Sequence, residues 1–193
     1  MFPTSFQPTD TLRIERDGRL FLLPMCRPMF RMYSEAHAID TFGGKDLLHV
    51  DGKPQFAEVA ILRVFESSGW QGRWLEPYQR GRMDPALLNA WNGNAFKHQI
   101  HLPIAESWVS ERLNAIAIKN GNSYAGCWDV VVWKDGRLVF AEGKRNKKDR
   151  MRDTQLRWLQ SALRCGCELE DFLVVEWIPD LRNTVVRGKS HPR

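Results

Sequence analysis

The sequence Lys-Asp-Gly-Arg at residues 134–137 lies between two apolar runs, Val-Val-Val-Trp and Leu-Val-Phe-Ala. An Asp-Gly pair in this setting is a strong signal for a β-hairpin with a two-residue turn. The turn predicts the register, because Lys134 then pairs with Arg137 and Val131 with Phe140. Both faces of the hairpin are apolar, so we expect it to lie in the centre of a sheet that is covered on both sides.

Segments on either side of the hairpin extend this pattern. Apolar periodicity and a stop at Gly69 predict a helix over residues 56–68, and a second helix is predicted over 149–164. Residues 70–78 and 171–177 are short apolar runs that are typical of buried strands. The order of helix, three strands, helix and strand predicts an α/β fold, with a central mixed β-sheet flanked by helices.

The length of 193 residues suits a single domain, whose core we expect over about residues 56–178. The dipeptide Asp84-Pro85 is typical of a helix N-cap followed by proline at the first helical position, so we expect a helix there. A further helix is predicted over 105–119. Residues 81–120 would then form a helical insertion before the hairpin.

Three charged residues stand at the open end of the predicted hairpin. The register places Asp129 opposite Glu142, and Lys144 lies two residues further on, so all three share one face of the sheet. Two opposed carboxylates repel each other unless a positive charge lies between them. Mg²⁺ is commonly held by one or two carboxylates together with waters and phosphate oxygens.

The pattern therefore predicts a site for metal-assisted hydrolysis of a phosphodiester. In such a site Lys144 would orient or deprotonate a water, or neutralise charge that builds up on the phosphate. The alternative is a salt-bridged strand end that is exposed to water.

Two polar residues interrupt apolar helix faces. Gln155 lies on the same helix face as Leu159, and Glu58 continues the stripe formed by Ile61 and Phe65. A buried polar group without partners costs roughly 1–3 kcal/mol. We expect both side chains to point toward the acids, although a polar group at the end of a stripe can also reach solvent.

These residues resemble the motif of the PD-(D/E)xK nuclease superfamily, the restriction-endonuclease-like fold, and within it the VRR-Nuc family. The resemblance is carried by Asp129, by Ala-Glu-Gly-Lys at 141–144, by residues 149–163 with Gln155, and by Glu58 on the first core helix. It covers a little over a third of the chain and does not account for the insertion.

The resemblance implies a DNA phosphodiester hydrolase that uses one or two Mg²⁺ or Mn²⁺ ions. Asp129 and Glu142 would be metal ligands, with the backbone carbonyl of Gly143 as a further oxygen. Lys144 would position or activate the attacking water. Glu58 would bind or support the metal, and Gln155 would be an accessory polar residue of the catalytic site.

Positive charge is concentrated after the hairpin, in a chain with a net charge of +5. A basic tail at 180–193 adds to a basic segment that contains Arg145, Lys147, Lys148, Arg150 and Arg152. Such clusters suit a polyanion, which under the nuclease hypothesis is DNA, although a charge run can also be a solvated face. The resemblance leaves a homodimer open, as well as the form of the DNA and the choice between endonuclease and exonuclease.

Two other classes of protein fit part of the pattern. One is a catalytically inactive nucleic-acid-binding module of the same fold, against which the complete set of Asp129, Glu142 and Lys144 argues, because DNA phosphates repel opposed acids. The other is a small α/β protein whose basic face binds an acidic protein partner. A zinc site at His98 and His101 is disfavoured, because no suitably spaced Cys or acid lies nearby.

The cysteines and the N-terminus indicate a cytoplasmic protein. The four cysteines form no paired CxxC motif and are expected to be reduced thiols. The N-terminus lacks the basic and then apolar pattern of a signal peptide, and no apolar run approaches the ~18 residues of a membrane span.

Overall fold

A computed structural model of the chain describes residues 1–33 and 44–180. The α-helices are α1 (Ala57–Glu66), α2 (Ser107–Lys119) and α3 (Asp153–Arg164), and short 3-10 helices lie at Thr4–Phe6, Phe96–His98 and Leu169–Asp171. The strands of the large sheet are β1 (Asp10–Arg16), β2 (Arg19–Cys26), β3 (Met29–Arg31), β6 (Gln71–Gly81), β7 (Asp84–Leu88), β8 (Val130–Lys134), β9 (Arg137–Arg145) and β10 (Phe172–Asp180). A separate small hairpin consists of β4 (Leu48–Val50) and β5 (Lys53–Gln55). The predicted basic tail from residue 181 onward lies outside the described residues.

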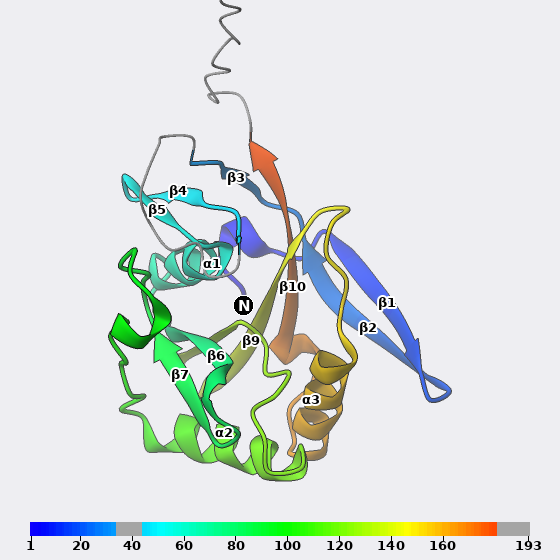
Figure 1. Cartoon of the computed structure of the whole chain (residues 1–193). Coiled ribbons are helices and arrows are strands. Elements are labelled where there is room, and N and C mark those ends of the chain that lie inside the picture. The colour runs from blue at the N-terminus through cyan, green and yellow to red at the C-terminus, as the bar shows by residue number, and fades with distance from the viewer. Residues whose placement is uncertain (34–43, 181–193) are drawn as a thin grey trace, which may run out of the picture.

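The predicted α/β class is confirmed, since helices flank one large mixed sheet (Figure 1). Its strands follow the order β1-β2-β10-β9-β8-β6-β7, and β3 pairs with β10 as well. β10 runs parallel to both β9 and β2, whereas β8 pairs antiparallel with both β6 and β9. The expected order of helix, three strands, helix and strand is therefore present as α1, β6, β8, β9, α3 and β10, with β7 and α2 inserted between β6 and β8.

The predicted hairpin register is confirmed from Lys134 paired with Arg137 to Val130 paired with Ala141. Asp135 and Gly136 both have positive φ, 49° and 77°, as the mirror-image turn of a two-residue hairpin requires. The hairpin therefore lies in the sheet as the sequence predicts, with β6 on one side and β10 on the other.

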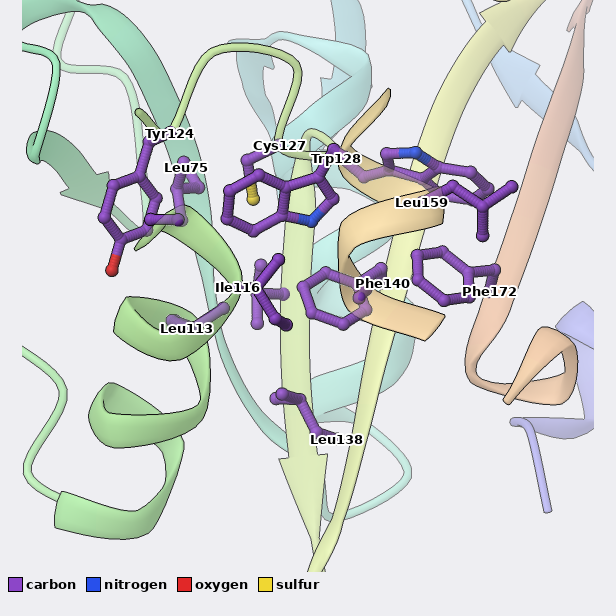
Figure 2. Close-up of a cluster of buried hydrophobic side chains, with 14 of the residues drawn as sticks. Leu75, Leu113, Ile116, Tyr124, Cys127, Trp128, Leu138, Phe140, Leu159 and Phe172 are labelled. Atoms are coloured by element: carbon purple, nitrogen blue, oxygen red, sulfur yellow. The ribbon is translucent and has the colours of Figure 1, made fainter. Parts of the chain in front are cut away.

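Each face of the hairpin is covered by different helices. One face packs on α1, and its hairpin residues are Val130, Val132, Val139 and Ala141. The other face packs on α2 and α3, and its hairpin residues are Val131, Trp133, Leu138 and Phe140. Figure 2 shows this second layer, in which Leu113 and Ile116 of α2 lie on the side of Phe140 that faces away from Phe172, and Leu159 of α3 lies beside Phe172. Covering both faces explains why nearly every hairpin residue between the turn and the open end is apolar.

The prediction of a helix at Asp84-Pro85 is wrong, because residues 84–88 form the strand β7. β7 is an edge strand that pairs only with β6 among the described strands, and Pro85 has no register partner in that ladder. An edge strand tolerates proline, since one side of the strand makes no ladder hydrogen bonds. The insertion over 81–120 is therefore a strand, a short 3-10 helix at Phe96–His98 and one α-helix, α2, which confirms the second helix predicted there.

Two further observations concern the chain as a whole. Among the described residues, no helix is both long enough and apolar enough to cross a membrane. All four cysteines are free thiols, as the sequence predicts, and burial raises the pKa of Cys26 to about 12.

Candidate active site

A cleft of about 670 Å³ opens at the end of the β8–β9 hairpin that is opposite its turn. The segments that line it are distant in sequence: residues 44–46, the start of α1, residues 76–78 of β6, the loop before β8, the end of β9, the loop between β9 and α3, the first turn of α3, and Trp177 of β10. All the residues predicted for the catalytic and metal sites line this cleft, namely Glu58, Asp129, Glu142, Gly143, Lys144 and Gln155. The structure thus brings these residues together, while their chemical roles stay predictions.

Glu142, Lys144 and Gln155 form one hydrogen-bonded group, and all three are buried. Lys144 Nζ donates to Glu142 Oε1 at 2.8 Å and to Gln155 Oε1 at 3.2 Å, and Gln155 Nε2 donates to Glu142 Oε1. Glu142 and Lys144 share a face because they are two residues apart on β9. Gln155 reaches them from α3, where its Oε1 also accepts from the backbone N–H of Arg152 at 2.9 Å and so caps the helix.

Asp129 lies one residue before β8, beyond the last pair of the ladder. Its backbone N–H donates to Glu142 Oε2 at 3.2 Å, and its Oδ2 accepts from the backbone N–H of Gly143 at 3.1 Å. The two acids are therefore neighbours, as predicted, but side-chain to backbone hydrogen bonds replace the expected strand pair.

The surroundings of Asp129 favour its protonated form in the absence of a cation. Partial burial removes water from around this carboxyl and raises its pKa well above the ordinary range, and the carboxylates of Glu142 and Glu58 raise it further. The charges of Lys45 and Lys144 act in the opposite direction. A site of this kind stabilises an added positive charge.

Two glycines allow the close approaches on which the site depends. Gly126, with φ of 83°, packs against the first turn of α3, where a Cβ would lie 2.1 Å from the carbonyl oxygen of Thr154. A Cβ on Gly143 would lie 3.1 Å from Ile61 Cδ1 and 3.5 Å from Asp129 Oδ2. Small residues at these positions let the loop before β8 approach α3, and let α1 approach β9.

Glu58 is buried in the first turn of α1, and its partner is a residue that sequence reasoning missed. Lys45 Nζ forms an ion pair with Glu58 Oε1. Burial lowers the pKa of Lys45, but Glu58, Asp129 and Glu76 together outweigh this effect and raise it. No local pattern marks Lys45, which follows two glycines in an apparent loop.

Glu76 of β6 is the second residue that sequence reasoning missed. Burial raises the pKa of its carboxyl, and the carboxylate of Glu58 adds to this, whereas the backbone N–H of Tyr78 and the charge of Lys45 lower it. The sequence signal for Glu76 was its charge within the predicted buried strand over 70–78. No second charged residue at a regular spacing pointed to the same site.

The predicted nucleic-acid-binding residues lie at one rim of the cleft. Lys148, Arg150 and Arg152 are exposed and line it, and Lys147 is exposed beside them. Arg145 is half-buried and forms an ion pair with Asp46 at 2.6 Å, which Lys148 also contacts at 3.3 Å. The exposed basic residues are available to a ligand, whereas Arg145 also fastens the segment around Asp46.

The acids of the cleft fit a metal ion that keeps much of its water. Among residues 1–33 and 44–180, no three His, Cys, Asp or Glu side chains are grouped closely enough to form a metal cage. Asp129 and Glu142 nevertheless supply two adjacent carboxylates, and no described residue donates a hydrogen bond to Asp129 Oδ1. Two carboxylates completed by waters and phosphate oxygens are typical of Mg²⁺ and Mn²⁺, and oxygen donors of this kind do not favour zinc.

Comparisons of the chain with protein-family models, with curated proteins and with solved structures found no match. The membership of the PD-(D/E)xK superfamily therefore stays a prediction, and the argument for function depends on the geometry of the cleft.

Proposed function

We propose that the protein is a metal-dependent DNA phosphodiester hydrolase, whose site is built from Asp129, Glu142 and Lys144. The observation that carries this proposal is the buried group of Glu142, Lys144 and Gln155 beside Asp129, at the floor of a cleft with a basic rim. Taking an ion pair out of water costs several kcal/mol per ion before the mutual attraction is counted. Charges held in this way at the floor of an open cleft are typical of a functional site.

The side chains would divide the work of hydrolysis among them. Asp129 and Glu142 would hold Mg²⁺ or Mn²⁺, with Gly143 and Glu58 as further predicted contributors. When bound, the cation supplies positive charge to the phosphate oxygens. Lys144 donates two of its N–H groups to Glu142 and Gln155, and no described residue accepts the third, which can reach a water or a phosphate oxygen.

In the proposed reaction a water oxygen forms a bond to phosphorus, and the bond from phosphorus to one ester oxygen breaks. The water loses a proton, and the departing alkoxide gains one by way of solvent. Lys144 would hold the attacking water, or balance the charge that develops on the phosphate. The exposed side chains of Lys147, Lys148 and Arg150 would bind the DNA backbone.

A catalytically inactive nucleic-acid-binding module is the second candidate, and one observation favours it. Glu58 is already paired with Lys45, and Glu142 with Lys144, so much of the acidic charge is compensated by the protein itself. Such a module would bind DNA through the same basic rim and would need no cation. The remaining candidate is a protein whose basic rim binds an acidic protein partner. That function would require neither a bound cation nor the acids of the cleft.

A cleavage assay distinguishes these functions. Plasmid, linear, single-stranded and branched DNA would be incubated with Mg²⁺, Mn²⁺ or EDTA and with wild type, Glu142→Ala or Lys144→Ala, with Lys134→Ala at the hairpin turn as the matched control. The proposal expects metal-dependent cutting that falls by about 100-fold or more in the first two variants and persists in the control. If all four proteins bind DNA equally and cut none of these substrates, the inactive module is the better account.

We also propose a cytoplasmic location, which the four free thiols support, because reduced cysteines persist in that compartment. A homodimer that cuts two strands is part of the same proposal. Sedimentation of the protein with and without duplex DNA would test it.

A further inference from the structure

Lys45 brings a positive charge into the cleft from a segment far from the predicted motif. Its Nζ forms an ion pair with Glu58 Oε1. The same ammonium group lies 5.2 Å from the ring centroid of Trp74 and 5.6 Å from that of Phe56. Aromatic faces attract a cation, so the acid and both rings favour a positive charge at this point.

The acids around Lys45 come from three different elements. Glu58 belongs to α1, Glu76 to β6 and Asp129 to the loop before β8, and all three line the cleft and act electrostatically on Lys45. Carboxylates gathered in this way repel each other unless a cation lies among them. In many two-metal hydrolases a second divalent ion supplies that charge.

The position of Lys45 is fixed by the next residue. Asp46 is bound by Arg145 at 2.6 Å and by Lys148 at 3.3 Å, so the segment 44–46 is fastened to the basic rim. Lys144, which is bonded to Glu142 and Gln155, compensates the other side of the site. The two lysines therefore form ion pairs with different acids of one cleft, and both act on Asp129.

We propose that Lys45 is a built-in cation, which supplies the positive charge that a second metal ion would bring to Glu58, Glu76 and Asp129, so that the site uses a single divalent cation. This inference rests on the proposed function for its catalytic meaning. The role of Lys45 toward the acids can be tested without catalysis. Lys45 is thus a positioning residue that holds Glu58 and completes the charge balance of the site.

The first test counts bound Mn²⁺ in the absence of DNA, by electron paramagnetic resonance or calorimetry. Wild type is expected to bind one Mn²⁺ per chain, and Lys45→Met, which keeps the apolar stem but removes the charge, is expected to bind two. Lys134→Met removes a charge at the hairpin turn, away from the cleft, and is expected to bind one, like wild type. A Lys45→Met variant that still binds one ion, or a wild type that binds two, would overturn the inference.

The second test needs neither a metal nor DNA. The thermal stability of metal-free wild type, Lys45→Met, Glu58→Gln and the double variant would be measured near neutral pH. Lys45→Met is expected to lower Tm, and this loss is expected to shrink by more than half when Glu58 is also neutralised, because the unpaired acid is then absent. Equal losses in both backgrounds would overturn the inference, and if Lys45→Met does not fold, recovery of folding in the double variant is the expected result.

The two tests separate this inference from the proposed function. A protein that cuts no DNA but shows the coupling between Lys45 and Glu58 would contradict the nuclease proposal. It would still support the role of Lys45 as the positive charge that stabilises the acids. A protein that cuts DNA with an unchanged metal count in Lys45→Met would support the nuclease and contradict the role given to Lys45.

Discussion

The two ends of the β8–β9 hairpin carry similar charged residues in opposite surroundings. At the turn, Asp135 is exposed and Lys134 reaches out to the carbonyl oxygen of Ser68 at 2.9 Å. At the open end, Glu142 is 1% exposed and Lys144 is 8% exposed. Near the turn, Arg137 also forms an ion pair with Asp171 at 3.4 Å. The salt-bridged and solvated strand end that the sequence alone also allowed therefore fits the turn and does not fit the open end.

The difference teaches that charge pattern and burial must be considered together. Exposed pairs contribute about 0–1 kcal/mol and need no functional explanation. A buried ion pair contributes little more than an apolar replacement would, because desolvation offsets the attraction. The open end therefore keeps its charges at a cost to stability, which is reasonable if those charges serve a ligand or a reaction.

The largest expected effect comes from Glu142→Ala. Loss of this carboxylate leaves the Lys144 ammonium buried without an acidic partner, so we expect the metal-free protein to lose about 3 kcal/mol of stability, together with DNA cleavage. Asp171→Ala removes the half-buried partner of Arg137 near the turn, together with the acceptor for the backbone N–H of Glu168, and should cost about 1 kcal/mol. Denaturant unfolding of both variants measures the contrast, and equal losses would remove the distinction between the two ends.

Lys144→Met should lower the rate of cleavage by more than its cost to stability explains. Some stability is lost as well, because Glu142 loses its cation and keeps only the donors of Gln155 and of the Asp129 backbone. The variant keeps the apolar stem but removes the donor that faces the cleft, and we expect cleavage to fall by about 100-fold with binding of DNA retained. Lys134→Met, the matched change at the turn, should leave the rate within about twofold of wild type. Single-turnover cleavage rates would show the contrast, and a similar fall in both variants would mean that the position of the lysine is irrelevant.

The stability of the metal-free protein should depend on pH through Asp129. Because its pKa is raised in the folded state, the folded protein binds more protons than the unfolded chain above the ordinary aspartate pKa of about 4. The stabilisation of the folded state that comes from this extra proton is complete below about pH 4, and it is lost as the pH rises through the raised pKa of Asp129. We expect Tm to fall over this range, and Asp129→Asn to reduce the slope.

Glu76 limits how much of that slope one substitution can remove. Its pKa is also raised, so it contributes in the same direction, and some slope should persist in Asp129→Asn. Added Mn²⁺ should raise Tm most at the high-pH end, where both carboxyls are ionised. A Tm that does not change with pH in metal-free wild type would contradict the environment assigned to Asp129.

The smallest expected effect concerns the basic rim. Arg150→Ala removes one exposed charge beside the cleft, and the slope of log affinity for duplex DNA against log salt should decrease by about 0.9 if that side chain contacts one phosphate. Lys134→Ala removes one charge at the turn and should leave the slope unchanged. Fluorescence anisotropy over a salt series measures both slopes. If the Arg150→Ala and Lys134→Ala proteins have the same slope, the DNA does not bind at the basic rim.

The sequence predicted the parts of the site that depend on local periodicity. The Asp-Gly turn set the register of the hairpin, and period two then placed Glu142 and Lys144 on one face. Helical periodicity likewise placed Gln155 toward them. These inferences need only short-range geometry, which the sequence specifies well.

Features that depend on distant contacts were not predictable in this way. Lys45 enters the cleft because Asp46 is tied to the basic rim about a hundred positions later in the chain, and no local signal encodes that contact. Residues 84–88 became a strand because β6 offered an open edge, which outweighed the local preference for a helix start at Pro85.

The central claim is that the buried charges at the open end of the hairpin hold a divalent cation. Anomalous diffraction from crystals soaked in Mn²⁺ tests it most directly. The account predicts a strong peak within about 2.5 Å of carboxylate oxygens of both Asp129 and Glu142. The absence of a peak between these two side chains at saturating Mn²⁺, or a peak found only elsewhere, would contradict it.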